Sequence, residues 1–104
     1  LDYAGISMDT SAHRVTRDGL AVPLGPTEFR LLRHFLEHPG RVFSREQLLD
    51  AVWGRDVYVE QRTVDVHIRR LRKAINGAGE GTAALPDVIR TVRSAGYALD
   101  REAH

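Results

Sequence analysis

The segment RTVDVHIRRLRKAI, residues 62–75, combines the apolar spacing of a helix with an unusual concentration of arginine. On a helical wheel its apolar residues form one narrow stripe, made of Val64, Ile68, Leu71 and Ile75. The opposite side, here named the basic strip, carries basic residues around a single valine: Arg62, Val66, Arg69, Arg70 and Lys73. Guanidinium and ammonium groups bind phosphate oxygens and displace their counterions, so the strip has the chemistry to hold a polyanion.

Val66 lies inside the basic strip, on the side of the helix that is expected to face water. A basic helix face is also typical of a simple solvated surface. However, like charges repel one another unless a partner offsets them, and a branched apolar side chain gains nothing from water. The major groove of B-DNA admits a helix and presents thymine methyl groups, whereas the major groove of A-form RNA is too narrow. The pattern therefore favours double-stranded DNA as the partner.

Other residues with catalytic or metal-binding potential do not form a recognisable site in the sequence. His34 and His38 have the i, i+4 spacing of a metal pair, but no third ligand is evident, and a solvated helix face explains them better. Ser44 is explained as a helix N-cap, since nothing places a base beside it. The stretch GAGEG lacks the Lys-Ser/Thr of a phosphate-binding loop. We therefore expect no enzyme activity, no metal and no cofactor.

Composition indicates a single globular domain over residues 1–104. The chain is 42% hydrophobic and 28% charged, which is ordinary for a folded domain of this length. Its net charge is only +1, yet residues 62–73 hold five basic residues and one acidic residue. No apolar run is long enough for a membrane span, and the lack of cysteine fits a cytoplasmic location. Because the chain begins at leucine, we expect a domain cut from a longer protein.

Strands are predicted at both ends of the chain. Residues 1–25 alternate in the manner of an antiparallel sheet, with Asp18-Gly19 as a hairpin turn. Residues 88–100 form a second hairpin around Ser94-Ala95-Gly96, after a glycine-rich loop at 76–87.

Three amphipathic helices are predicted between the strands, within residues 27–76: residues 27–38, 44–53 and 62–75. Thr27 is the expected N-cap of the first helix, which Pro39-Gly40 ends. Ser44 and Gln47 have the spacing of a capping box at the start of the second. Together these helices would supply the core that holds the basic segment.

The C-terminal hairpin carries Arg90 and Arg93, and Arg93 precedes its turn. An arginine projecting from a hairpin tip is attracted to the enhanced negative potential of an A·T-rich minor groove. Taken alone, Arg93 would be explained as a surface arginine. The order of strands, three helices and hairpin is that of a winged helix, in which a second DNA contact beside the basic helix is expected.

Several long motifs resemble one family. In chain order they are GPTEFRLLRHFLEHPGRVFSREQLL, VWG, RTVDVHIRRLRKAI and IRTVRSAGY. From about Ile6 to Leu99, the chain resembles the DNA-binding effector domain of OmpR/PhoB-type response regulators. The resemblance implies an α+β winged helix-turn-helix with an N-terminal antiparallel sheet, a three-helix core and a C-terminal β-hairpin wing. It also implies a transcription factor of a two-component system, and VYVEQRTVDV is most similar to the phosphate-starvation regulators.

The resemblance assigns DNA contacts residue by residue. The third helix would enter the major groove with base contacts from Val66, Asp65 and Arg70, and Arg93 of the wing would enter the minor groove. Phosphate contacts fix register, whereas base contacts specify sequence. The DNA backbone would be contacted by Arg62, Thr63, His67, Arg72, Trp53, Thr91 and Tyr97, joined by Arg69 and Lys73 of the basic strip. Tandem direct repeats are the expected sites.

The segment GRDVYVEQ, residues 54–61, resembles the transactivation loop of the family. In activators this loop contacts the sigma subunit of RNA polymerase. The residues expected in that contact are Gly54, Val57, Val59, Glu60 and Glu46. The family pattern has a second acidic residue where this chain has Gln61. The phosphorylated receiver domain, a further expected partner, is not part of these 104 residues.

The alternative function is that of a winged-helix protein–protein interaction module without DNA binding. Such a module would not be expected to keep a basic strip and a wing arginine together.

Overall fold

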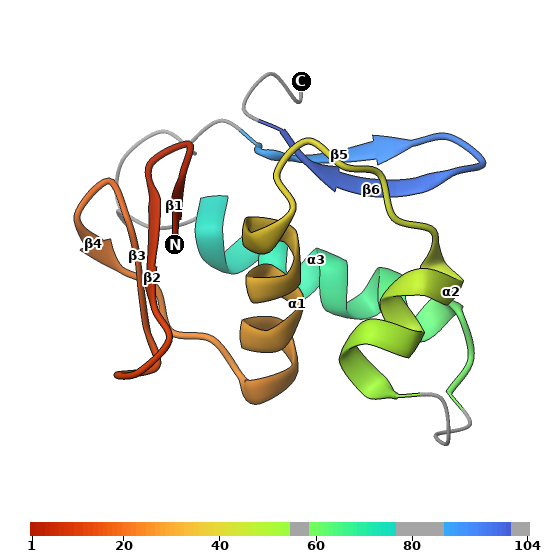
Figure 1. Ribbon diagram of the computed structural model, residues 1–104, viewed down its shortest axis with the longest axis horizontal. Coiled ribbons are helices and arrows are strands. Elements are labelled where there is room, and N and C mark those ends of the chain that lie inside the picture. The colour runs from red at the N-terminus through yellow and green to blue at the C-terminus, as the bar shows by residue number, and fades with distance from the viewer. Residues whose placement is uncertain (55–58, 77–86, 101–104) are drawn as a thin grey trace.

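The computed structural model describes residues 1–54, 59–76 and 87–100. Strands come first, helices follow, and a hairpin ends the described chain (Figure 1). This order confirms the winged helix predicted from the sequence. The elements are β1 (Asp2–Tyr3), β2 (Ile6–Asp9), β3 (Arg14–Arg17), β4 (Leu20–Ala21), α1 (Pro26–Glu37), α2 (Arg45–Leu48), η1 (Leu49–Trp53), α3 (Arg62–Asn76), β5 (Ile89–Val92) and β6 (Gly96–Leu99).

Strands β1 to β4 form an antiparallel sheet in chain order. Between β3 and β4 the register pairs Arg17 with Leu20 and leaves Asp18 and Gly19 as the turn, with φ angles of 50° and 84°. Positive φ at both positions is the type I′ geometry, which aspartate and glycine tolerate, so the predicted hairpin is confirmed. The sheet contributes three buried side chains to the core: Ile6, Met8 and Val15.

Helix α1 begins earlier than predicted. Its N-cap is Gly25 and its first residue is Pro26, so the assignment of Thr27 as N-cap was wrong. Proline suits the first turn, because its fixed φ is helical and its missing N–H would have no partner there. The helix ends at Glu37, ahead of Pro39-Gly40 as predicted.

The predicted second helix is divided into two segments. The Ser44 side chain accepts a hydrogen bond from the backbone N–H of Gln47, whose side chain accepts one from the backbone N–H of Ser44, so the capping box is confirmed. After four α-helical residues the chain widens into the π-helical segment η1. Gly54, with φ 93°, ends it. This wider turn brings Trp53 beside α3, where its ring lies 5.3 Å from that of His67.

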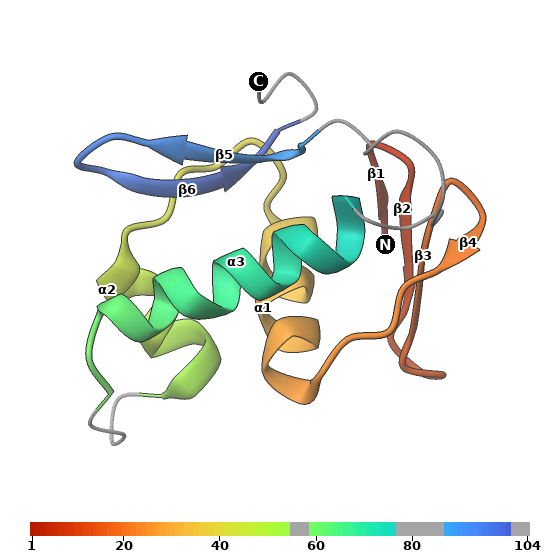
Figure 2. The same cartoon turned by 180° about the vertical axis from the view of Figure 1, so that it is seen from behind.

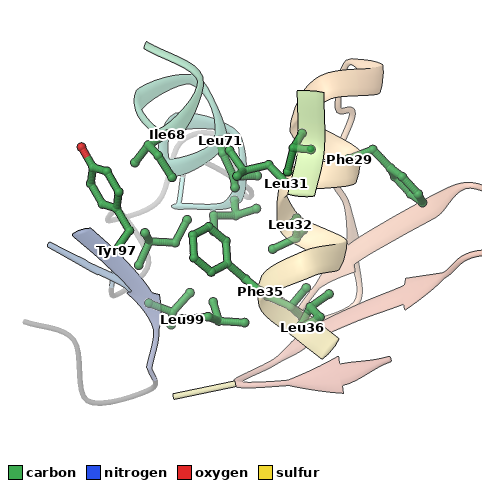
Figure 3. Packing of buried hydrophobic residues seen from close by; sticks show 14 of the residues in the cluster. Phe29, Leu31, Leu32, Phe35, Leu36, Ile68, Leu71, Tyr97 and Leu99 are labelled. Atoms are coloured by element: carbon green, nitrogen blue, oxygen red, sulfur yellow. The ribbon is translucent and has the colours of Figure 1, made fainter. Parts of the chain in front are cut away.

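Helix α3 crosses the molecule from α2 towards the N-terminal sheet, behind α1 in Figure 1 and in front of it in Figure 2. Its predicted apolar stripe is confirmed, since Val64, Ile68, Leu71 and Ile75 are at most 1% exposed. Figure 3 shows Ile68 and Leu71 of this stripe facing α1 and the C-terminal hairpin, in one cluster with Phe35 and Leu99. The core therefore holds α3 from one side and leaves the opposite side outward.

The C-terminal end of α3 is fixed to the N-terminal sheet by a buried arginine. Arg17 of β3 is 3% exposed and donates hydrogen bonds to the Ile75 carbonyl oxygen, at 3.1 Å, and to Asn76 Oδ1, at 2.7 Å. A cation at a helix C-terminus also meets the negative end of the helix dipole. The sheet thus helps to set the direction of α3.

The hairpin β5–β6 is the wing. Its register pairs Val92 with Gly96, so the turn is Arg93-Ser94-Ala95 rather than the predicted Ser94-Ala95-Gly96. Gly96 belongs to β6 because the main chain passes against Phe43 there. A Cβ at this glycine would lie 1.8 Å from the Phe43 carbonyl oxygen. The glycine thus serves a close approach, not the turn.

Candidate nucleic-acid interface

The basic strip of α3 is exposed as the helical wheel predicted. Val66 is 47% exposed, which makes it one of the most exposed large apolar side chains among the described residues. The cationic members of the strip are exposed as well: Arg62, Arg69, Arg70 and Lys73. An apolar group surrounded by cations forms a surface that could neutralise phosphates and contact a methyl group together.

The charges of the basic strip are largely uncompensated. Arg62 Nε lies 2.7 Å from Glu60 Oε2, but both side chains are more than 70% exposed, so this pair contributes little to stability. Within the described ranges, Arg69, Arg70 and Lys73 have no hydrogen bond or ion pair. Their cationic groups are therefore available to an anionic partner.

Asp65, expected at a base, is engaged within the protein. Its Oδ1 accepts a hydrogen bond from Arg45 Nε at 2.7 Å and a second, short one from the Tyr97 hydroxyl. Burial alone would raise the pKa of Asp65, but these two hydrogen bonds outweigh it and hold the pKa below its ordinary value. Asp65, in its ionised form, therefore connects α3 to α2 and to β6.

Arg72 and Tyr97, both expected at DNA phosphates, also have partners within the protein. The guanidinium of Arg72 donates to the Ile89 carbonyl oxygen at 2.6 Å and to Thr91 Oγ1 at 2.7 Å. Its Nε lies 3.3 Å from Asp87 Oδ2. The Tyr97 ring packs beneath two guanidinium carbons, that of Arg45 at 5.5 Å and that of Arg72 at 5.6 Å. These contacts connect α3 to both strands of the wing.

His67, another expected phosphate contact, pairs with Glu28 of α1. His67 Nδ1 lies 2.5 Å from Glu28 Oε1, and the two side chains are only 17% and 11% exposed. Burial raises the pKa of Glu28, but the hydrogen bond and the charge interactions with His67 and Arg70 outweigh it, so the net pKa is lowered. The pair links the first turn of α1 to the middle of α3.

Sequence reasoning missed both Glu28 and Arg45. Glu28 has the ordinary position of an acid in the first turn of a helix, and Arg45 follows a capping serine. Their partners lie 39 and 20 residues away along the chain, so no local spacing signals the pairing.

Arg93 is exposed in the turn of the wing, and Thr91 is exposed on β5. Arg90 differs, since its Nε lies 3.7 Å from Asp100 Oδ2. Thr63 at the start of α3 and Trp53 at the end of η1 are half-buried at the margin of the same surface. The structure therefore brings most of the expected DNA-contacting residues to one side formed by α3 and the wing.

The expected polymerase-contacting residues are only partly described. Gly54, Glu60 and Glu46 are exposed and Val59 is half-buried, whereas Val57 lies outside the described residues. His34 and His38 do not gather further ligands: in the described part of the chain no group of three potential metal-binding side chains occurs. Nor do the described helices include one with the length and apolarity needed to cross a lipid bilayer.

A four-stranded sheet, three helices, a β-hairpin and an outward basic helix define a winged-helix domain of the DNA-binding type. Residues 19–99 match the family model described as transcriptional regulatory protein, C terminal. The chain belongs to this family, whose members are parts of transcription regulators and not enzymes.

Several curated relatives are regulators of the phosphate regulon. The chain is 60% identical over 95 residues to the phosphate regulon transcriptional regulatory protein PhoB of Rhizobium meliloti (strain 1021), covering 91% of this chain and 40% of the relative. It is 52% identical over 97 residues to PhoB of Escherichia coli (strain K12), covering 93% and 40%. The chain thus spans about two-fifths of the length of the curated relatives it matches.

Solved structures match the fold over nearly the whole chain. The DNA-binding domain of the response regulator AdeR, in complex with an intercistronic region, aligns with a TM-score of 0.82 at 29% identity, covering 96% of this chain and 98% of that one. The DNA-binding domain of RstA from Klebsiella pneumoniae, in complex with the RstA box, aligns with a TM-score of 0.80 at 29% identity, covering 98% and 97%.

Proposed function

We propose that this domain binds double-stranded DNA in a sequence-specific manner, with α3 in the major groove and Arg93 of the wing in the adjacent minor groove. The proposal rests on the exposed basic strip, in which Val66 is surrounded by cations. Three of them, Arg69, Arg70 and Lys73, have no hydrogen bond or ion pair within the described residues, and the pair of Arg62 with Glu60 is highly exposed. A helix of this kind fits the width of the major groove. The DNA-binding domains of AdeR and RstA, which share this fold in complexes with an intercistronic region and the RstA box, support it.

Within that arrangement the exposed side chains take separate roles. Val66 contacts a thymine methyl group and Arg70 contacts a base edge, while Arg62, Arg69 and Lys73 neutralise phosphates. Thr63, Trp53 and Thr91 lie at the margin, where they reach the DNA backbone. Three further residues have side chains that are already hydrogen-bonded within the protein: His67, Arg72 and Tyr97. They can bind a phosphate only if the same side chain also keeps its partner in the protein.

The biological role that we propose is control of phosphate-regulon genes by a response regulator in the cytoplasm, as the names of the curated relatives suggest. The full-length protein would carry a receiver domain, bind tandem direct repeats and activate transcription through the sigma subunit of RNA polymerase. Gly54, Val57, Val59, Glu60 and Glu46 are the residues proposed for that last contact, and Gln61 weakens its acidic character.

Selection of binding sites from a pool of random duplexes tests this proposal. The expected result is enrichment of one sequence motif that contains thymine and is flanked by an A·T-rich segment at the position of the wing. In a matched pair of duplexes, replacing that segment by G·C pairs should weaken binding by the native domain more than binding by Arg93→Ala. Recovery of unselected sequences and no retardation of any duplex at low salt would instead support a protein–protein module.

A further inference from the structure

We propose that Asp65 is a positioning residue, which holds the wing at a fixed angle to α3 through the Tyr97 hydroxyl and thereby sets where Arg93 meets the DNA. The inference rests on the proposed DNA-binding function and deepens it. It replaces the base contact expected for Asp65 by an intramolecular role that no sequence motif assigns.

Main-chain and side-chain hydrogen bonds attach the wing to the rest of the domain. On β6, the Leu99 carbonyl oxygen accepts one from the Gly40 N–H at 2.7 Å. Tyr97 exchanges two backbone hydrogen bonds with Phe43, at 2.8 and 2.9 Å, which fixes β6 against the connection that precedes α2. The side chain of Tyr97 donates to Asp65, on α3. On the other strand, Ile89 and Thr91 accept hydrogen bonds from Arg72, on α3 as well.

The side-chain hydrogen bonds to Asp65 and Arg72 restrict the tilt of the hairpin, which the main-chain hydrogen bonds leave free. The main-chain hydrogen bonds to Gly40 and Phe43 all lie on β6, so they hold that strand in place but leave the hairpin free to tilt about it. Asp65 and Arg72 are seven residues apart on α3, about 10 Å along its axis. Two attachments at that separation, one on each strand, define the direction of the hairpin relative to the helix, which it overlies in Figure 2.

Arg45 keeps Asp65 in the state that this role requires. Its Nε donates to the same carboxylate oxygen at 2.7 Å, and its guanidinium carbon lies 5.5 Å from the centre of the Tyr97 ring. A charged acceptor makes a stronger hydrogen bond than a neutral one. An acceptor used twice within the protein also has less capacity left to accept from a base. Asp65, Arg45 and Tyr97, here named the Asp65 cluster, therefore act as one unit.

A double-mutant cycle on DNA affinity separates this role from a direct contact. Tyr97→Phe removes one hydroxyl without changing the charge, and Arg93→Ala removes the residue that the cluster is proposed to position. We expect Tyr97→Phe to weaken binding by about fivefold in the native background and to have almost no effect once Arg93 is alanine. Equal losses in the two backgrounds would mean that the hydroxyl contacts DNA itself, and would overturn the proposal.

Two further variants control the cycle. Tyr3→Phe removes a hydroxyl from β1 of the N-terminal sheet and should leave affinity unchanged in both backgrounds. Asp65→Asn keeps the shape of the side chain but removes the charge of the acceptor that Tyr97 uses, and it should show the same dependence on Arg93 as Tyr97→Phe. It therefore decides the question even if Tyr97→Phe fails to fold, and a loss that does not depend on Arg93 again overturns the positioning role.

A measurement without DNA distinguishes failure of this inference from failure of the proposed function. The chain has no cysteine, so spin labels can be attached through Lys73→Cys on α3 and Ala95→Cys in the wing turn. Pulsed dipolar spectroscopy should give a narrow distance distribution that broadens with Tyr97→Phe but not with Tyr3→Phe. Equal widths would refute the positioning role whether or not the domain binds DNA, whereas broadening in a domain that binds no duplex would refute only the DNA function.

Discussion

The two outward sides of α3 differ in what their side chains do before any partner arrives. On the basic strip, Arg69, Arg70 and Lys73 have no bonded partner within the described ranges, and Val66 is half exposed. On the side towards the wing, Asp65 and Arg72 are both hydrogen-bonded to other elements. The side chains on one side of the helix are thus available to bind a ligand, whereas those on the other side stabilise the packing of α3 against other elements.

Residue type alone therefore does not determine the role of a side chain on a helix of this kind. Arg72 and Arg69 are both arginines of α3, yet only Arg72 contacts the wing.

Gly96→Ala should strongly destabilise the domain, because Gly96 lies where the wing packs against the backbone of Phe43. The added methyl would lie 1.8 Å from the Phe43 carbonyl oxygen, and the residue has a φ of 139°. We expect a loss of about 2–5 kcal/mol in the free energy of unfolding, measured by denaturant titration. Gly19→Ala is the matched control, since it also has positive φ but no atom within 4 Å of the new Cβ. Similar losses for both variants would show that backbone strain, not close contact, dominates.

Arg70→Ala tests the basic strip. If Arg70 contacts a base edge, the variant should lose about 1–3 kcal/mol of binding free energy on the preferred site and relax the preference at one base position. Lys73→Ala, its neighbour on the same face, should weaken all sequences alike. Competition binding against single-base variants of the site measures both effects. A uniform loss with Arg70→Ala would reassign this residue to a phosphate.

Val66→Ala should have a smaller and more specific effect. Removing two methyl groups from a contact with a thymine methyl costs roughly 1 kcal/mol. The native domain should prefer thymine to uracil at one position of the site, and the variant should lose that preference while its salt dependence stays the same. Retention of the thymine preference would show that Val66 does not contact the base. Val64 could not make this contact instead, because it is buried in the core.

The pH dependence of stability tests the internal side of the comparison, with the smallest expected effect. The pKa values of Asp65 and Glu28 are lowered in the folded protein. Their contribution to stability is therefore complete above the unfolded values of about 4 and is lost as pH falls through the lower folded values. Denaturation midpoints between pH 6 and pH 3 should fall less steeply for Asp65→Asn and Glu28→Gln than for the native chain. Parallel curves would show that these pairs do not persist in solution.

The sequence predicted those parts of the fold that depend on local pattern. The 3.6-residue period of α3 fixed both its buried stripe and the outward position of Val66, and Asp18-Gly19 identified a hairpin by its own backbone preference. Local pattern could not predict the function of Gly96. A glycine is required there because the backbone of Phe43, far away in the sequence, passes too close for a Cβ atom. The pairing of Asp65 with Arg45 and Tyr97 is equally non-local, so its expected base contact came from resemblance alone.

If the basic strip binds the DNA backbone, duplex binding must weaken as the salt concentration rises. With the domain and its selected site, the logarithm of the association constant should fall linearly with the logarithm of salt concentration. About three to five phosphate contacts from the strip and the wing predict a slope of about −2.7 to −4.5. A slope near zero, or no binding to any duplex at low salt, would show that the basic strip does not bind the DNA backbone.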